Sequence, residues 1–367
     1  MFAYWGRRGA LCRHTLNLAE TVAKLEEPGT TVSISRSNEI FQGFARFGDL
    51  IFPVETFSSE IGAFSHVLQL VKLRRRLAAR FESDGTRSFV SLMSHVWSPL
   101  TVPVIRRAGI RHVVVVHDAE AHPGDYPNIV NKWLLREARA ADRVVALSHA
   151  TAQQLVSAGR ISREKITVLF LPDLDYGQAA PTRLQSTDPL RVLFMGRILA
   201  YKGLGLFVGA LELLREKGIR VNAGVFGAGD LGEYVDRLST LGAEVENHWI
   251  DDRNFNAILA RYDVVVVSYI SGTQSGVIST AFGAGLPVVI TPVGGLVEQV
   301  TPEVTGIVAS AVSVEALADA IRQLAEDRLL LERLREGVVA TAQSRSMRHF
   351  FDAIASIALD HGDRNRE

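Results

Sequence analysis

Short runs of β-branched and other apolar residues alternate with amphipathic stretches along the whole chain. Runs such as Val113–Val116 are apolar at successive positions, which is typical of a strand covered on both faces in a parallel sheet. The strands predicted in the first half are Phe2–Trp5, Thr31–Ser35, Leu50–Val54, Ser88–Leu92, His112–Val116 and Arg143–Leu147. The helices predicted between them include Arg13–Glu26, Phe64–Phe81 and Ile129–Ala140. This alternation predicts an α/β fold with right-handed crossovers and a doubly wound sheet.

The first of these strands is short. Gly6 breaks it after Trp5, although the first strand of a parallel sheet usually lies centrally and has about five or six residues. Two explanations stay open: the strand is very short, or the natural start of translation lies upstream.

The second half repeats the pattern, and two sheets are favoured over one because twisted sheets seldom exceed about 10 strands. Its predicted strands are Leu190–Met195, Val221–Phe226, Val245–Trp249, Val264–Ser268 and Val288–Thr291. Its predicted helices are Gly205–Glu216, Leu231–Leu241, Asn254–Tyr262, Ser275–Gly285 and Val314–Leu324. The polar stretch Asp173–Pro189 is interpreted as an interdomain linker. We therefore expect one domain over residues 1–173, a second over 174–345, and a terminal segment over 346–367.

Composition narrows the function classes. Of 367 residues, 47% are hydrophobic, which excludes bulk disorder, and 40 basic residues balance 40 acidic ones, which argues against a nucleic-acid binder. The single cysteine, Cys12, excludes an internal disulfide and a thiolate zinc cluster, and it fits a reducing cytosol. No apolar run approaches the roughly 18 residues of a membrane span, and we expect no signal peptide.

Charge differs between the two halves. Residues 1–173 hold 22 Lys/Arg and 16 Asp/Glu, a balance of +6, which leaves −6 for the rest. The predicted helix over Val67–Phe81 carries five cations and no acid. Two interpretations stay open: peripheral contact with an anionic membrane, or a core-packed helix with a solvated basic face.

Glycine-containing turns follow four of the strands predicted in the second half. The sharpest is Gly196-Arg197, which ends a buried strand, with Lys202 at the entry of the next helix. Cations are unfavourable near a helix N-terminus, so a bound anion would compensate them. A diphosphate suits an Arg fork and a Lys point charge. The alternative is a pair of solvated surface cations.

The other three turns are Phe226-Gly227-Ala228-Gly229-Asp230, Ser271-Gly272-Thr273-Gln274-Ser275-Gly276-Val277 and Thr291-Pro292-Val293-Gly294-Gly295-Leu296-Val297-Glu298. Glycine lets backbone amides approach a phosphate, and a following helix adds its positive dipole end. A single turn of this kind is more often ordinary turn chemistry, so the indication comes from their combination with charged residues.

In this order, from about Pro189 to Arg345, the motifs resemble family 4 of the retaining glycosyltransferases, which have the GT-B fold of two Rossmann-like domains. The first half resembles the family more loosely, through the loop Tyr4–Ala10 and the strand-end pair His117-Asp118. Ser346–Leu359 resembles the final helix that in this family returns to the N-terminal domain.

The resemblance implies transfer of a sugar from a UDP- or GDP-sugar to a glycan or lipid-linked acceptor, with no metal and no other cofactor. The expected location is the cytoplasm, and peripheral contact with the inner face of the membrane is one of the two interpretations that stay open for the basic helix. The implied catalytic residues are His117, Arg197 and Lys202. The implied donor-binding residues are Gly9, Gly196, Arg197, Lys202, Gly227, Gly229, Gln274, Ser275, Gly276, Val277 and Glu298, with Gly9 also opening the acceptor side. The expected acceptor-side residues are Arg7, Arg8, His95 and His122.

The chain departs from the family pattern at one place. The family usually carries two glutamates eight positions apart around the Ser-Gly-Val helix, whereas no acidic residue occurs from Val264 to Val297 here. Gln274, Ser275 and backbone groups are the expected substitutes. Two other functions therefore stay open: a GT-B nucleotide-sugar epimerase, and a glycosyltransferase-like protein that binds without turnover.

Other chemistries find little support. There is no Gly-x-Ser-x-Gly elbow for a serine hydrolase, and Gly227-x-Gly229 lacks the third glycine of a dinucleotide fingerprint. His112, His117 and His122 lie on a strand and a loop without the i,i+4 spacing of a helical metal site.

Overall fold

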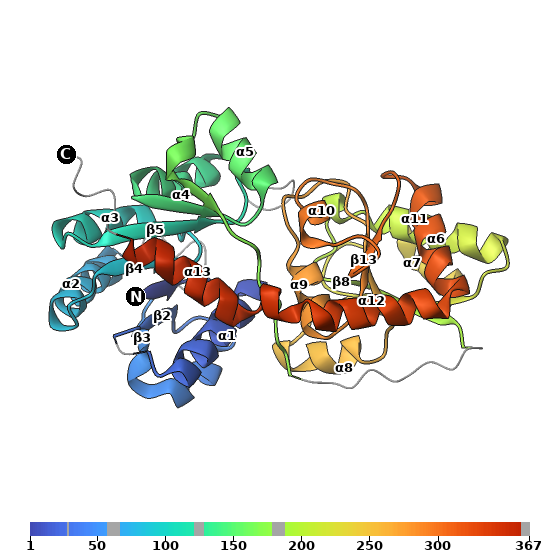
Figure 1. Ribbon diagram of the computed structural model, residues 1–367, viewed down its shortest axis with the longest axis horizontal. Coiled ribbons are helices and arrows are strands. Elements are labelled where there is room, and N and C mark those ends of the chain that lie inside the picture. Colours follow the sequence, from blue (N-terminus) through green and yellow to red (C-terminus); the bar gives the residue numbers. More distant parts are fainter. Residues whose placement is uncertain (28, 57–66, 121–127, 178–187, 361–367) are drawn as a thin grey trace. The chain divides into compact units, whose positions relative to one another are not determined.

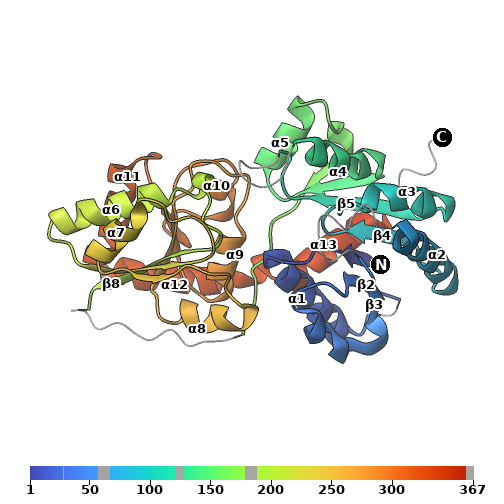
Figure 2. The same cartoon turned by 180° about the vertical axis from the view of Figure 1, so that it is seen from behind.

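The computed structural model describes residues 1–27, 29–56, 67–120, 128–177 and 188–360 (Figure 1). The chain divides into two compact units, which Figures 1 and 2 show from opposite sides. Unit 1 contains the described residues up to Phe170 together with those from Met347 onward, and unit 2 contains Leu171–Ser346. Each unit has its own parallel sheet and its own hydrophobic core.

A seven-stranded parallel sheet runs through unit 1 in the order β3-β2-β1-β4-β5-β6-β7. Its strands are β1 (Phe2–Tyr4), β2 (Val32–Ser35), β3 (Ile51–Val54), β4 (Ser88–Ser91), β5 (Arg111–Val116), β6 (Arg143–Ala146) and β7 (Ile166–Val168). Although β1 has only three residues, it lies at the centre and pairs with β2 on one side and β4 on the other. The strand order reverses between β1 and β4, which is the crossover point of a doubly wound sheet.

Helices cover both faces of this sheet. They are α1 (Ala10–Leu25), α2 (Val67–Ser83), α3 (Ser98–Arg107), α4 (Asn128–Ala140), α5 (His149–Ser157) and α13 (Met347–Leu359), with 3-10 turns η1 (Phe41–Leu50) and η3 (Arg163–Lys165). Apolar side chains of α2 and α3 pack with Phe89, and those of α4 pack with Val114. On the opposite face, α13 lies beside α1, and the ring of Phe351 contacts that of Phe2 at a centroid distance of 5.7 Å. The expected terminal helix thus belongs to unit 1.

The six-stranded parallel sheet of unit 2 has the order β10-β9-β8-β11-β12-β13. Its strands are β8 (Leu190–Met195), β9 (Val221–Phe226), β10 (Glu244–Glu246), β11 (Val264–Val267), β12 (Val288–Ile290) and β13 (Gly306–Val308). Its helices are α6 (Leu204–Glu216), α7 (Tyr234–Thr240), α8 (Phe255–Leu259), α9 (Gly276–Gly283), α10 (Leu296–Gln299), α11 (Val314–Glu326) and α12 (Arg328–Ala340), with 3-10 turns η4 (Ala200–Lys202), η5 (Asp252–Asn254) and η6 (Ala342–Arg345). The crossover point of this sheet lies between β8 and β11.

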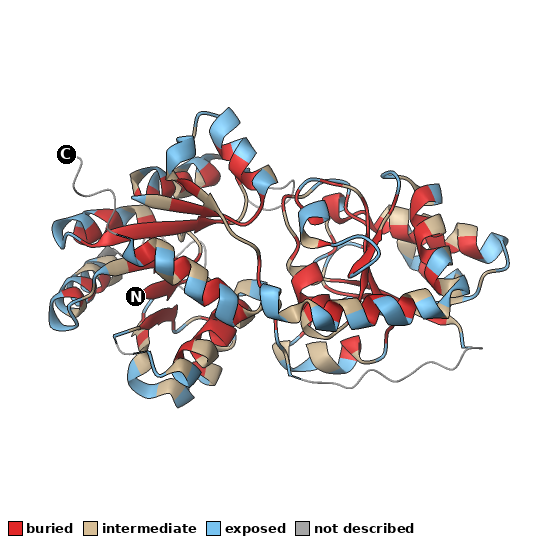
Figure 3. Cartoon of the chain, in the orientation of Figure 1, coloured by how far each residue is buried: buried red, intermediate tan, exposed pale blue. Residues whose placement is uncertain are grey.

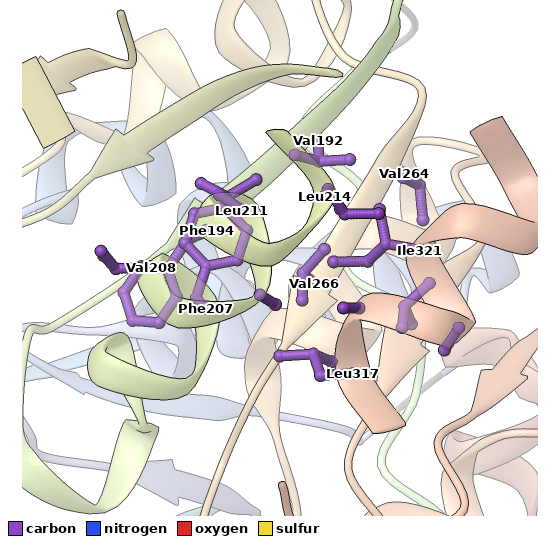
Figure 4. Packing of buried hydrophobic residues seen from close by; sticks show 14 of the residues in the cluster. Val192, Phe194, Phe207, Val208, Leu211, Leu214, Val264, Val266, Leu317 and Ile321 are labelled. Carbon is purple, nitrogen blue, oxygen red and sulfur yellow. The ribbon is translucent and has the colours of Figure 1, made fainter. Parts of the chain in front are cut away.

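The packing of β11 on both faces explains why its residues are apolar at every position. Val264 and Val266 pack into a cluster with α6 and α11 (Figure 4), whereas Val265 and Val267 pack with α8 and α9 on the opposite face. Figure 3 shows the central strands of both sheets as buried, whereas the edge strand β10 is mostly exposed. The prediction of doubly covered parallel strands is confirmed, and with it the α/β fold class.

Several elements were not predicted. The strands β7 and β13 are three-residue edge strands, too short for a periodicity signal. The helix α3 was missed because Pro103 lies inside it, and proline in a helix interior removes a backbone hydrogen bond. The strand β10 ends at Glu246, three residues before the predicted end at Trp249.

The start of the stretch interpreted as a linker is part of unit 2. The Asp173 amide donates to Arg345 O at 2.9 Å, and the Leu174 amide donates to Ser279 O at 3.0 Å. Gly283 is needed there, because a Cβ at this position would lie 2.0 Å from Leu174 O. Among the described residues, no helix is both long and apolar enough to cross a membrane.

Candidate functional site

The loop that follows β8 brings three of the predicted donor-side residues together at the crossover point of unit 2. Gly196 has a φ of 103°, which a side chain would disfavour. A Cβ on Gly196 would lie 3.3 Å from Val277 Cγ2 and 3.7 Å from Lys202 Nζ. The carboxyl end of β8, the turn η4 and the start of α9 therefore meet at one point. This is the place where doubly wound sheets bind ligands.

Lys202 is the buried cation of this site. Lys202 is only 8% exposed, and its Nζ donates a hydrogen bond to Tyr269 Oη. No carboxylate among the described residues forms an ion pair with it. A buried ammonium group without a counter-charge is costly, so this group favours an anionic ligand.

Ser275 starts the helix α9 beside that lysine. Its Oγ accepts from the Val277 amide at 3.2 Å and donates to Tyr269 Oη at 3.1 Å. Gly276 is the first helical residue, so its amide belongs to the positive end of α9. The structure thus brings Ser275, Gly276 and Val277 next to Lys202, as the sequence predicts.

The glycines after β9 lie against the loop after β8. A Cβ on Gly227 would lie 1.8 Å from Gly196 O, and one on Gly229 would lie 2.3 Å from Ile198 O. Backbone hydrogen bonds continue the pairing beyond the strands, from the Ile198 amide to Ala228 O at 2.8 Å. Packing alone therefore explains both glycines, and their predicted contact with a donor stays a prediction.

The remaining donor-side predictions lie on exposed or half-buried positions. Arg197 is exposed directly after Gly196, Gln274 is half-buried directly before the cap of α9, and Glu298 is exposed in the first turn of α10. The neighbour of Glu298, Gln299, contacts the site. The Ser275 amide donates to Gln299 Oε1 at 2.6 Å, and Gln299 Nε2 donates to Ser275 O at 3.2 Å.

In unit 1, His117 follows β5 at the carboxyl edge of the sheet. Its Nε2 lies 2.9 Å from Leu92 O, and because a carbonyl only accepts, Nε2 carries the proton. Burial lowers the pKa of His117, so the ring is neutral near pH 7. A neutral imidazole with a fixed tautomer can accept a hydrogen bond or a proton at Nδ1.

His95 follows β4 at the same edge. Its Nδ1 accepts from the Trp97 amide at 3.2 Å, and its ring meets Trp5 and Trp97 edge-on. Burial lowers the pKa of His95 to about 4. The fourth predicted acceptor-side residue, His122, lies outside the described residues.

Residues after β2 hold the loop that contains Arg7, Arg8 and Gly9. The Gly9 amide donates to Glu39 Oε1 at 2.8 Å, and the Glu39 amide donates to Arg7 O at 2.9 Å. Asn38 Nδ2 donates to Gly6 O at 3.1 Å. Gly9 has a φ of 104°, and a Cβ there would meet nothing within 4 Å, so it faces open space. We call Asn38 and Glu39 the loop clamp.

The comparisons with known proteins agree with this architecture. Residues 13–170 match the family described as Glycosyltransferase Family 4, and residues 189–327 match Glycosyl transferases group 1. The chain belongs to the family 4 glycosyltransferases. The family assignment and the GT-B fold implied by the resemblance are thus confirmed.

Individual members are only distantly similar. The D-inositol 3-phosphate glycosyltransferase of Xylanimonas cellulosilytica is 27% identical over 267 residues, which cover 67% of this chain and 63% of that protein. The sulfoquinovosyl transferase SQD2 of Arabidopsis thaliana is 26% identical over 355 residues, which cover 86% of this chain and 68% of that protein. HepE of Anabaena, crystallised with UDP, matches with a TM-score of 0.71 and 17% identity over 97% of this chain and 98% of that one. The chain spans less than two thirds of the length of the first relative.

The sequence analysis missed four residues of these two sites: Tyr269, Gln299, Asn38 and Glu39. Tyr269 follows β11 by two positions, so the rule that ligands bind at strand carboxyl ends would have found it. Nothing in the local sequence marks Gln299 or the loop clamp, because their contacts join separate loops.

Proposed function

We propose that the chain is a glycosyltransferase that moves a hexose from a nucleotide-diphosphate sugar to a glycan or lipid-linked acceptor, with retention at the anomeric carbon and without a metal ion. One observation carries the proposal: the buried ammonium group of Lys202 lies between Gly196 and the start of α9, at the crossover point of the sheet. The donor belongs on the 174–345 domain and the acceptor on the 1–173 domain.

Arg197 and Lys202 supply the chemistry of the leaving group in this proposal. As the sugar–phosphate bond breaks, negative charge builds on the nucleoside diphosphate, and fixed cations stabilise that charge. In other enzymes, divalent metal ions stabilise this leaving-group charge. UDP is the favoured nucleotide, because HepE of Anabaena was crystallised with UDP and with UDP-glucose. His117 lies on the acceptor side and accepts at Nδ1.

The acceptor is proposed to be lipid-linked because of the outer face of α2. The inner face, with Leu73 and Leu77, is part of the core of unit 1. On the outer face Leu68 is 78% exposed, and Lys72 and Arg75 are exposed beside it. Apolar and cationic side chains on one exposed face suit an anionic lipid surface. The chain would then act at the cytoplasmic side of a membrane, in the synthesis of a surface or exported polysaccharide.

A second candidate is a binding protein without turnover, and the run Val264–Val297, which contains no acidic residue, favours it. The test is a thermal-shift screen with UDP, GDP and their sugars, followed by turnover of whichever nucleotide sugar binds. A ligand that binds the native state raises the unfolding midpoint. We expect a shift with UDP and slow release of UDP from UDP-glucose. Binding of a nucleotide sugar without release of UDP would favour the second candidate. Interconversion of free nucleotide sugars would favour an epimerase. No shift of the unfolding midpoint with any nucleotide would overturn the proposal.

A further inference from the structure

Tyr269 lies at the centre of the donor site, and neither the family pattern nor the sequence analysis gives it a role. It follows β11 and is 3% exposed. Thr291 Oγ1 donates to its backbone carbonyl, and the ring of Tyr201 meets its ring edge-on at 5.7 Å. Thr291 therefore fixes the backbone of Tyr269, and Tyr201 fixes its ring.

Two donors already point at its hydroxyl oxygen. Lys202 Nζ donates to Tyr269 Oη, and Ser275 Oγ lies 3.1 Å from the same oxygen. Ser275 Oγ in turn accepts from the Val277 amide at 3.2 Å. The lysine, the tyrosine, the serine and the first turn of α9 thus form one continuous chain of hydrogen bonds.

In this series of hydrogen bonds, one hydroxyl proton has no acceptor. Lysine donates only, while each hydroxyl has one proton to give. If Ser275 donates to Tyr269, the phenol proton has no acceptor among the described residues; if Tyr269 donates to Ser275, the serine proton has none. In both cases one hydroxyl proton remains at a buried position, next to an ammonium group and a helix N-terminus. A buried donor without an acceptor is costly.

We propose that the hydroxyl of Tyr269 donates this proton to the anionic group bound beside Lys202, and so is a direct ligand of the donor diphosphate. An anion at this point accepts from the phenol, from Lys202 and from the amino end of α9 at once, and so satisfies every donor of the chain. Charge-assisted hydrogen bonds of this kind are about twice as strong as neutral ones. The inference rests on the proposed function, because that function supplies the diphosphate.

The test compares Tyr269→Phe with Tyr262→Phe in the full chain. Tyr262 is similarly buried in the same unit, and its hydroxyl donates to Glu244 Oε2 at 3.1 Å, so both variants remove the hydrogen bonds of a buried phenol. Tyr269→Phe keeps the ring and its contact with Tyr201. Calorimetric titration with UDP and with inorganic pyrophosphate measures affinity, and the ³¹P chemical shift of the bound β-phosphate reports the hydrogen bond itself.

We expect Tyr269→Phe to weaken UDP and pyrophosphate by about ten- to a hundredfold and to move the β-phosphate resonance, with Tyr262→Phe like the wild type. Equal affinity and an unmoved resonance in Tyr269→Phe would overturn the inference and leave the proposed function standing. Failure of the wild type to bind either probe would overturn both. Should Tyr269→Phe not fold, as judged by its melting curve, Tyr269→Met is titrated in its place.

Discussion

Lys202 places an ammonium group where burial is costly unless a counter-charge is near. Its hydrogen bond to Tyr269 leaves other donors of the ammonium group to a ligand, and Gly196 leaves room beside it. Arg197 is exposed on the same loop and can approach a bound anion from the surface. At the scale of single residues, the proposed donor site is thus a small set of cations and hydroxyls around a glycine.

Replacing either cation tests the proposed chemistry. Arg197→Ala or Lys202→Ala should lower the turnover of UDP-glucose by about 100- to 1000-fold, because each removes one charge that stabilises the leaving group. Steady-state release of UDP measures the effect. The matched control is Arg220→Ala, an exposed arginine of the same unit, which should turn over like the wild type. Unchanged turnover in both site variants would remove the two cations from the mechanism.

His14 gives unit 1 a pH-dependent stability. It is 2% exposed, its ring meets Phe350 edge-on, and neither ring nitrogen has a hydrogen-bond partner among the described residues. Burial, with a smaller contribution from His117, lowers the pKa of His14 to about 3. Between pH 6.5 and 3 the unfolded chain therefore binds a proton that the folded chain does not.

The free energy of unfolding should consequently fall as the pH drops through that window, by about 1.4 kcal/mol per pH unit from this one group. His14→Leu should reduce the slope by that amount between pH 6 and pH 4, as measured by urea denaturation at several pH values. The exposed His149 of the same unit, changed to Gln, serves as the control. An unaltered slope in His14→Leu would show that another group carries the pH dependence.

Loops from neighbouring strands, rather than single elements, build both candidate sites. The helix α1 has no side-chain cap of its own and no acidic residue in its first turn. Glu39, from the loop after β2, accepts from the Gly9 amide instead. The register of β1 with β2 makes this possible, because Tyr4 lies opposite Ile34 and the two loops leave the sheet side by side.

The loop clamp can be tested by hydrogen exchange. Glu39→Ala should increase amide exchange in the segment from Gly6 to Arg13 about tenfold, because the Gly9 amide loses its acceptor. Glu39→Gln keeps an acceptor oxygen and should restore most of the protection. Glu55→Ala removes a carboxylate that pairs with Arg36 near the end of the next strand, and should leave this segment unchanged. Equal exchange in all four proteins would mean that Glu39 does not fix the loop.

The outer face of α2 should determine binding of the protein to anionic vesicles. Arg76 and Arg80 lie over the ring of Phe52 at 4.8 Å and 5.9 Å, so they are partly engaged within unit 1. Lys72 and Arg75 are exposed and are the cations available to a lipid surface.

Lys72→Gln with Arg75→Gln should abolish most co-sedimentation with anionic vesicles at low salt, because each cation near the surface contributes about 1 kcal/mol. Wild-type binding should also decline as salt shortens the Debye length from about 10 Å at 0.1 M towards 3 Å at 1 M. Arg107→Gln with Arg163→Gln makes the same charge change at exposed positions elsewhere in unit 1. Equal loss in both pairs would indicate a general charge effect, and no binding by the wild type would favour a soluble acceptor.

At the scale of the whole molecule, two parallel sheets with the same strand order carry the two sets of candidate residues. The strand order of the six-stranded sheet matches that of the first six strands of unit 1. In each sheet the crossover point lies between the first and the fourth strand in sequence order, β1 and β4 in unit 1 and β8 and β11 in unit 2. The donor-side residues lie at one crossover, and the Gly9 loop and His95 lie at the other. Each sheet therefore has an edge suited to a ligand, and the proposed transfer would use one edge for the donor and the other for the acceptor.

The proposed turnover of UDP-glucose should survive chelation. The proposed reaction relies on Arg197 and Lys202 for leaving-group charge, so UDP release from UDP-glucose should be unchanged in EDTA and not stimulated by Mg²⁺ or Mn²⁺. The same preparation of Lys202→Ala measured with and without Mg²⁺ serves as the comparison. Loss of activity in EDTA that returns with either metal would contradict the proposed metal independence.

The sequence by itself determined the α/β class, the two sheets and most of their strands, because doubly covered strands must be apolar at successive positions, as in β11. It also marked Gly196, Lys202 and Ser275, since strand ends, glycines and caps are local signals. The tertiary structure decided what those signals could not: that Tyr269 and Gln299 contact the predicted donor residues, that Glu39 rather than a local side chain accepts from the start of α1, and that Gly227 and Gly229 are required by packing. Those roles depend on distances between loops far apart in the chain, which strand register and crossover order fix and local sequence does not.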